Sequence, residues 1–199
     1  MIQNPVLVPA NYFARLEKAD IFAGGDRALE VDLGCGDGSF LVQMARLHPD
    51  RCFLGVERLL GRVEKTARRI GDAGLKNARI LRLDSSYVVG WMLPLRGVSR
   101  LHLLCPDPWP KVKHHRRRLF NDPEFLEGLE SALEPGGEFL LKSDDLPYFE
   151  NALEAMSERV AFERIEWLDD EHYPRTSFEK QWLALGKEIH RARWRLRAT

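Results

Sequence analysis

The sequence predicts an α/β fold of the Rossmann-like class, with helices on both faces of a mostly parallel, seven-stranded sheet. Short apolar runs alternate along the chain with amphipathic segments, which is the pattern of parallel strands joined by crossover helices. A glycine-rich turn follows the first apolar run, and a proline-rich corner with a basic arm follows the fourth. Ligands of such sheets gather just beyond the carboxyl ends of the strands, so both segments are candidates for a binding site.

The strands are expected where short apolar runs end in turn-forming residues. The fourth run, for example, contains Leu101-His102-Leu103-Leu104 and leads directly into the proline-rich corner. The last predicted strand, over 178–185, is read as the return of the chain to the sheet. In chain order, the predicted strands cover residues 28–33, 52–56, 78–83, 98–104, 138–142, 162–167 and 178–185.

Helices are expected where apolar residues recur at helical spacing. Phe40, Met44 and Leu47 show this spacing and share one face. A later helix begins where Asp122 precedes Pro123, an N-cap residue followed by proline in the first turn, and it ends at a Pro-Gly-Gly turn. In chain order, the predicted helices cover residues 11–22, 39–48, 60–73, 86–92, 122–134 and 146–159.

A chain of 199 residues favours a single domain with a substantial core. We expect that domain to cover 1–199, with an N-terminal helical extension over 1–27 and a basic C-terminal tail over 187–199. Lys and Arg number 30 and Asp and Glu number 30, so the net charge is zero, but the basic residues are clustered. Such clusters fit a specific polyanion better than a nonspecific coat. They lie within residues 58–69, 111–118 and 187–197.

The cysteines and the apolar runs bear on cellular location. Cys35, Cys52 and Cys105 lack the spacing of a metal site, so we expect reduced thiols and no bound metal. Neither a signal peptide nor a run long enough to span a bilayer is visible. We therefore expect a cytoplasmic protein, without a membrane contact, that is a monomer or a homodimer.

The glycine turn predicts a cofactor site. Gly34 and Gly36 allow the backbone to approach a ligand closely, because no Cβ intrudes. Asp32 precedes the turn, and Glu57 and Asp84 end the second and third strands at the same sheet edge. These acids suit a cationic ligand, and the Gly-x-Gly-x-Gly spacing differs from the dinucleotide pattern. The sequence thus favours S-adenosylmethionine over NAD. For each acid, the alternative is a solvated carboxylate at a strand end that binds no ligand.

The segment 106–118 joins an acidic and aromatic corner to a basic arm. Asp107 places a carboxylate just past the carboxyl end of a strand, at the expected mouth of an active site. Trp109 either stacks on a base or anchors the corner. The arm itself is either a solvated basic loop or a set of phosphate contacts, and the Asp-Pro-Trp sequence beside it favours contacts. The candidate phosphate contacts are Lys111, Lys113, Arg116, Arg117 and Arg118.

These motifs, in their order along the chain, resemble the tRNA (guanine-N7-)-methyltransferases. The glycine turn is shared by many methyltransferases, whereas Pro-Asp-Pro-Trp-Pro-Lys followed by basic residues is far more specific. The resemblance implies the class I methyltransferase form of the fold, S-adenosylmethionine as cofactor, and methylation of N7 of a guanine in the variable loop of tRNA. It extends over about residues 28–186 and is carried by 32–38, 55–57, Asp84, 106–111, Ser143-Asp144 and 176–179.

Carried over by position, the resemblance implies cofactor contacts at Asp32, Glu57, Asp84 and Asp107, with Asp107 also in the active-site role. It implies tRNA contacts at Lys111, Asp144, Thr176, Ser177, Phe178 and Glu179.

The chain departs from the family pattern in four places, three of them near the implied tRNA contacts. Asp32 stands where glutamate is usual, Ser177 where lysine is usual, Gln181-Trp182 where Arg-Gly is usual, and Lys187 where histidine is common. Three alternatives remain from the residues alone: a methyltransferase acting on another RNA, a protein or a small molecule, a non-catalytic RNA-binding subunit, and a nicotinamide oxidoreductase.

Overall fold

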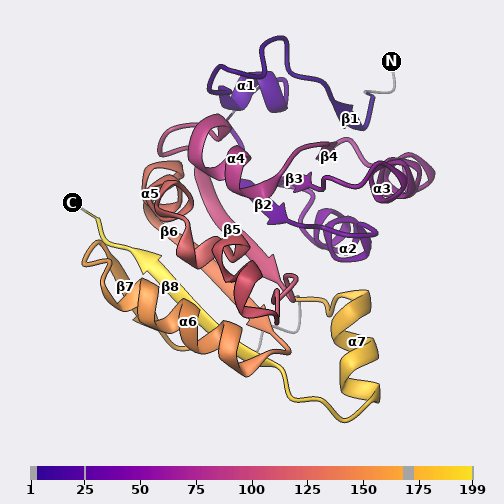
Figure 1. Ribbon diagram of the computed structural model, residues 1–199. Helices are drawn as coiled ribbons and strands as arrows, with labels where there is room; N and C mark the ends of the chain where they lie inside the picture. The colour runs from indigo at the N-terminus through magenta and orange to yellow at the C-terminus, as the bar shows by residue number, and fades with distance from the viewer. Residues whose placement is uncertain (1–3, 25, 168–172, 199) are drawn as a thin grey trace.

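The computed structural model describes residues 4–24, 26–167 and 173–198 and is built on one eight-stranded sheet (Figure 1). The strand order is β1-β4-β3-β2-β5-β6-β8-β7. The first six strands in this order are parallel, and β8 is antiparallel to both of its neighbours. The strands are β1 (Val6–Leu7), β2 (Leu29–Leu33), β3 (Cys52–Val56), β4 (Ala78–Leu81), β5 (Val98–Leu104), β6 (Leu133–Ser143), β7 (Phe162–Ile165) and β8 (His190–Leu196).

Helices cover both faces of the sheet, as the sequence predicts (Figure 1). On one face, α2 (Ser39–Leu47) and α3 (Leu60–Asp72) bury Phe40, Met44, Val63 and Ile70 against β3 and β4. The other face is covered by the π-helix η1 (Val88–Met92), by α5 (Pro123–Ala132) and by α6 (Leu146–Ser157). These helices and the strands that they cover form the larger core cluster. The remaining helical segments are α1 (Lys18–Ile21), α4 (Ser85–Tyr87), η2 (Val112–Arg117), η3 (Leu119–Asn121) and α7 (Ser177–Ala184).

Side chains that accept from free backbone N–H groups fix the starts of α5, α6 and α7. Asp122 accepts from the Glu124 N–H at 3.1 Å, which confirms the predicted start of α5. Asp145 caps α6 in the same manner, and Thr176 accepts from the Glu179 N–H at 3.0 Å to begin α7. Each such cap contributes about 1 kcal/mol to stability.

The prediction of a strand over 178–185 is wrong, because these residues form α7. Thr176 caps this helix, and Phe178 and Trp182 lie one turn apart on it. The strand that returns to the sheet is instead β8, inside the segment predicted as a basic tail. There, Arg191, Arg193 and Arg195 alternate with Ala192, Trp194 and Leu196, which are buried. This period of two is a strand pattern, but the density of arginine suggested a solvated end of the chain.

The N-terminal segment is also less helical than predicted. Only Lys18–Ile21 forms a helix within 11–22, because the Asn11 side chain accepts from the Phe13 N–H and holds a turn there. Val6–Leu7 adds the eighth strand by pairing with β4, where Val6 lies opposite Ile80. The sheet therefore has one strand more than the seven expected.

Replacement of Trp194 by alanine tests whether β8 belongs to the folded core. Trp194 is buried and stacks on Phe139 of β6, with ring centres 5.6 Å apart. We expect Trp194→Ala to lower the free energy of unfolding by about 3–5 kcal/mol, as for other buried tryptophans. Urea denaturation measures this value. Arg197→Ala, an exposed residue one position beyond β8, is the control and should change stability little. Equal effects would contradict the placement of β8.

Candidate active site

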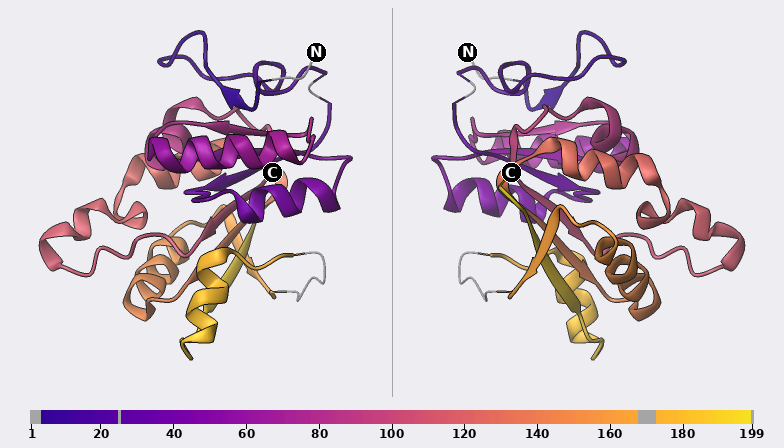
Figure 2. Two further views of the ribbon diagram at one scale, coloured as in Figure 1. Left: turned by 90° about the vertical axis from the view of Figure 1, so that its right-hand side faces the viewer. Right: turned by 90° about the vertical axis from the view of Figure 1, so that its left-hand side faces the viewer.

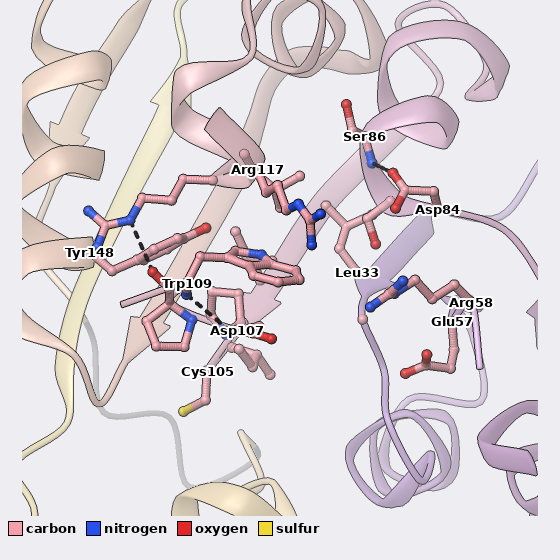
Figure 3. Close-up of a pocket in the computed structure, with 18 of the residues that line it drawn as sticks. Leu33, Glu57, Arg58, Asp84, Ser86, Cys105, Asp107, Trp109, Arg117 and Tyr148 are labelled. Carbon is pink, nitrogen blue, oxygen red and sulfur yellow. Dashed lines mark hydrogen bonds between the residues drawn. The ribbon is translucent and has the colours of Figure 1, made fainter. Parts of the chain in front are cut away.

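A cleft of about 1000 Å³ opens along the carboxyl ends of the parallel strands (Figure 3). Glu57 and Asp84 lie on one side of it, and Asp107, Trp109 and Tyr148 lie on the other. The acidic residues come from consecutive strand ends, because parallel strands bring their carboxyl ends to one edge. Of the residues predicted for the site, the cleft is lined by Gly34, Glu57, Asp84, Asp107, Arg116, Arg117, Arg118, Asp144 and Phe178.

The glycine turn leaves room for a ligand beside the backbone. Gly34 has a φ of +68°, which favours glycine, and a Cβ built there would meet no atom within 4 Å. Gly36 also has a positive φ but lies deeper, below Phe178. Gly38 is required by packing, because a Cβ would come within 2.5 Å of Thr66 of α3. The turn therefore exposes backbone to the cleft at Gly34 and packs against α3 at Gly38.

Asp32 lies beneath the cleft with one unpaired oxygen. Its side chain is buried, and Oδ2 has no hydrogen-bond partner among the described residues. Burial, together with the negative charge of Glu57, raises the pKa of Asp32 to about 8. A bound cation would supply the missing partner, so this pair of carboxylates fits a ligand with an ammonium or sulfonium group.

Two of the other predicted cofactor acids, Glu57 and Asp84, are partly engaged by nearby backbone. Glu57 accepts from the Leu59 N–H at 2.9 Å and lies 3.7 Å from the Arg62 guanidinium. Asp84 accepts from the Ser86 N–H at 2.9 Å and so caps α4. These contacts hold the carboxylates in fixed orientations at the edge of the cleft.

The corner after β5 has a strained and specific geometry. Cys105 and Trp109 both have positive φ values, at 51° and 46°, although neither is glycine. Oδ1 of Asp107 accepts from the Trp109 N–H at 3.0 Å, which closes the corner into an Asx turn. Burial and the negative charge of Asp144 raise the pKa of the Cys105 thiol to about 12, so it remains protonated. The corner therefore presents no thiolate at Cys105.

The basic arm projects outward from the body of the protein, as the pink segment in Figure 2 shows. Lys111 and Lys113 are exposed and do not line the cleft. Arg117 lies over the Trp109 ring, 4.8 Å from its centre. Arg118 differs from its neighbours, because it is buried and its Nε donates to the Pro108 carbonyl at 3.0 Å. Arg118 thus fastens the base of the arm to the corner.

Within the segment 176–179, three residues make structural contacts and one lines the cleft. Thr176 caps α7, and the Ser177 hydroxyl lies 2.9 Å from that of Ser39. Glu179 is buried in an ion pair with Lys142 of β6, at 2.7 and 3.0 Å. Phe178 alone of the four lines the cleft. Of the other three side chains, Glu179 joins α7 to the sheet, Ser177 contacts α2, and Thr176 caps α7 itself.

Several cleft residues were not predicted as site residues. Trp182 and Lys187 line the cleft because 178–185 is a helix and not a strand. Arg58 and Arg62 belong to a basic cluster that the sequence does show. Two other members of that cluster, Lys65 and Arg69, instead pair with Asp37 of the glycine turn at 3.6 and 3.0 Å. Charge clustering alone could not separate these roles.

Comparison with known proteins identifies the family of this chain. A family model described as "Putative methyltransferase" matches residues 26–192. The tRNA (guanine-N(7)-)-methyltransferase of Syntrophotalea carbinolica is 32% identical over 200 residues, which cover 96% of this chain and 86% of that protein. The enzyme of the same name from Halorhodospira halophila is 36% identical over 172 residues, 84% of this chain and 74% of that one. The chain belongs to the tRNA (guanine-N7-)-methyltransferase family.

Solved structures agree on the fold of this family member. The 16S rRNA methyltransferase KamB superposes with a TM-score of 0.64 at 21% identity, over 85% of this chain and 88% of that one. This confirms the predicted class I methyltransferase fold. Among the described residues, no cluster of three or more His, Cys, Asp or Glu could hold a metal ion. Within the same residues, every helix is too short or too polar to cross a membrane.

The raised pKa of Asp32 predicts a pH-dependent stability. The unfolded chain releases this proton near the ordinary pKa of 3.8, while the folded protein holds it to about pH 8. Between these values the unfolded state binds fewer protons, so stability falls as pH rises, with a limiting slope of about 1.4 kcal/mol per pH unit. We expect Asp32→Asn to remove this slope, so that its stability relative to wild type increases from about pH 4 to pH 8.

Urea denaturation at several pH values, without cofactor, measures the effect. Asp50→Asn changes an exposed aspartate and serves as the matched control, with a difference from wild type that stays constant over the same range. A constant difference for Asp32→Asn as well would show that its carboxyl is already ionised in the folded protein.

Proposed function

We propose that this protein transfers a methyl group from S-adenosylmethionine to N7 of a guanine in the variable loop of tRNA. The observation that carries the proposal is the position of Asp107. It lines the same cleft as Gly34, Glu57 and Asp84, and it stands at the base of an outward-pointing basic arm. Membership of the family and the names of the relatives support the same activity.

The buried acids fit the cofactor. Asp32 offers a desolvated oxygen without a partner among the described residues, Glu57 lies close enough to affect its charge, and Gly34 leaves open space beside the backbone. When bound, S-adenosylmethionine supplies a methyl group activated by a positively charged sulfur, and the guanine N7 lone pair accepts it as the sulfur–carbon electron pair stays with sulfur. Asp32, Gly34, Gly36, Glu57 and Asp84 are the residues that we assign to holding it.

The protein's part in the reaction is orientation and electrostatics. N7 of neutral guanine has a free lone pair, so no general base is required. Holding both reactants at near-attack distance could supply about 7–11 kcal/mol of the barrier. The guanine becomes positively charged during transfer, and the Asp107 carboxylate stabilises that charge. Its Oδ1 is fixed by the Trp109 N–H, so the carboxylate is oriented before substrate binds.

The basic arm and the corner are assigned to tRNA. Lys111 and Lys113 are exposed on the projecting segment, where they can reach phosphates. Trp109 has its ring beneath Arg117 and lines the cleft, so we assign it to anchoring the corner and bounding the base site. The three free cysteines suit the reducing cytoplasm, which is the location that we propose.

Methylation of an unmodified transcript tests the activity. The protein is incubated with tRNA transcript and methyl-labelled S-adenosylmethionine, the RNA is digested, and the labelled nucleoside and its position are identified. We expect 7-methylguanosine in the variable loop. Label on another RNA or position would support a different methyltransferase, and no label together with RNA binding would support an accessory subunit.

Removing the charge of Asp107 should impair methyl transfer without unfolding the protein. Asp107→Asn keeps an oxygen that can accept from the Trp109 N–H but loses the negative charge. We expect kcat to fall by about a hundredfold, the scale of one preorganised electrostatic contact. Single-turnover assays measure the rate, and the thermal midpoint should stay within the error of wild type. Wild-type turnover in this variant would remove Asp107 from the proposed mechanism.

Removing two lysines of the arm should weaken tRNA binding and its salt dependence. We expect Lys111→Ala together with Lys113→Ala to reduce the slope of log affinity against log salt by about 0.7–0.9 for each phosphate that is no longer neutralised. Filter binding at several salt concentrations gives the slope. Arg46→Ala together with Lys76→Ala removes two exposed charges near the opposite edge of the sheet and is the matched control. Equal slopes in the two double variants would show that the arm does not touch the backbone.

A further inference from the structure

Two similar groups of side chains lie along α7. Phe178 and Trp182 are one helical turn apart and both line the cleft. The Arg62 guanidinium lies 5.6 Å from the Phe178 ring centre and 3.7 Å from Glu57. The Lys187 ammonium lies 3.7 Å from the Trp182 ring centre and 3.1 Å from Asp144 Oδ2. Each aromatic ring therefore has a cation that is also paired with a strand-end carboxylate.

The group around Trp182 lies away from the cofactor acids. Asp144 follows β6, whose neighbour β5 leads into Asp107, so Asp144 and Asp107 leave the sheet side by side. The Asp144 side chain is only 12% exposed, whereas that of Lys187 is 44% exposed. A largely desolvated carboxylate and an aromatic ring are thus covered by one flexible, solvent-accessible side chain.

The helix α7, which carries Trp182, is fixed in place by side-chain contacts. Glu179 of α7 forms a buried ion pair with Lys142, two residues before Asp144 in the chain. The Ser177 hydroxyl contacts that of Ser39 at the start of the helix. Lys187 itself is joined to α7 through its backbone N–H, which donates to the Trp182 carbonyl. Its side chain can therefore leave the ring without displacing the helix.

The ammonium group occupies a place suited to guanine. Guanine presents a flat π face, which can stack on an indole, and an N1–H and an exocyclic amine, which can donate to a carboxylate. After methylation at N7 the ring carries a positive charge, which strengthens both its attraction to the indole face and its attraction to the carboxylate. A methylated guanine therefore offers the same two interactions that Lys187 makes.

We propose that Trp182 and Asp144 form the subsite for the target guanine and that Lys187 occupies this subsite before substrate binds. Lys187 then competes for the subsite with the methylated base, which favours product release. The inference rests on the proposed function for the identity of the base. It assigns a role to Trp182 and Lys187, two of the positions at which this chain departs from the usual family residues.

Binding of nucleosides to the full-length protein tests the proposal. The probes are guanosine and 7-methylguanosine, which carry no phosphate, so that interactions with an RNA backbone cannot contribute. Lys187→Met keeps the length of the side chain and removes its charge. We expect this variant to bind 7-methylguanosine about fivefold more tightly than wild type, the scale of one displaced cation–π contact. Lys180→Met removes an exposed charge from α7, the helix that carries Trp182, and should leave binding unchanged.

A second variant tests the ring. We expect Trp182→Ala to abolish the preference for 7-methylguanosine over guanosine, and Trp182→Phe to restore part of it. Titration calorimetry or saturation-transfer NMR gives the affinities without any methyl transfer. The helix content of each variant, by circular dichroism, shows that α7 is retained.

The outcomes separate this inference from the proposed function. Equal affinity of wild type and Lys187→Met for 7-methylguanosine, a preserved preference in Trp182→Ala, or no binding at millimolar nucleoside would each overturn the subsite. If the nucleoside results are as expected but tRNA is not methylated, the subsite stands and the proposed function fails. If tRNA is methylated but neither variant changes nucleoside binding, the proposed function stands and the subsite is overturned.

Discussion

The buried ion pair between Lys142 and Glu179 is the constraint on which the α7 side of the cleft depends. Lys142 lies on β6 and Glu179 on α7, and residues 173–176, which lead into α7, lie outside every strand that the structure describes. Both side chains are only about 7% exposed, so each charge has little access to water and relies on the other as its partner. The pair therefore fixes α7 at the carboxyl edge of the sheet, where Phe178 and Trp182 complete the wall of the cleft.

The electrostatics of the cleft follow from the same sheet edge. Parallel strands deliver Glu57, Asp84, Asp107 and Asp144 to one side of the molecule, and Asp32 lies buried behind them. In the free protein, backbone N–H groups or nearby cations engage Glu57, Asp84, Asp107 and Asp144, while burial keeps Asp32 protonated near neutral pH. Cationic ligands, whether a sulfonium donor or a methylated base, are the partners that suit such a set of acids.

The sequence predicts the parallel half of this architecture well and the last quarter poorly. Strands β2 to β5 coincide with apolar runs, and the turn at Gly34 and the cap at Asp122 lie where residue type demands them. The strand predicted over 162–167 is confirmed as β7, but beyond it local pattern gives the wrong answer. The apolar residues of 178–185 fit a strand or a helix, and only the cap at Thr176 and the distant Lys142 decide for a helix. The arginines of β8 are neutralised in part by Glu138, a long-range contact that sequence spacing does not reveal.

The hydrogen bond between Arg118 and Pro108, at the base of the arm, bears on how far the length of the arm can change. The Arg118 guanidinium donates to the Pro108 carbonyl and lies 5.7 Å from the ring centre of Tyr148 on α6, so the two ends of the arm are tied together and to the body. The cost of closing a loop rises only slowly with its length. Insertions or deletions at the tip can therefore be absorbed without moving Asp107. The arm is in this sense a replaceable module: its length can change while the corner that carries Asp107 keeps one geometry.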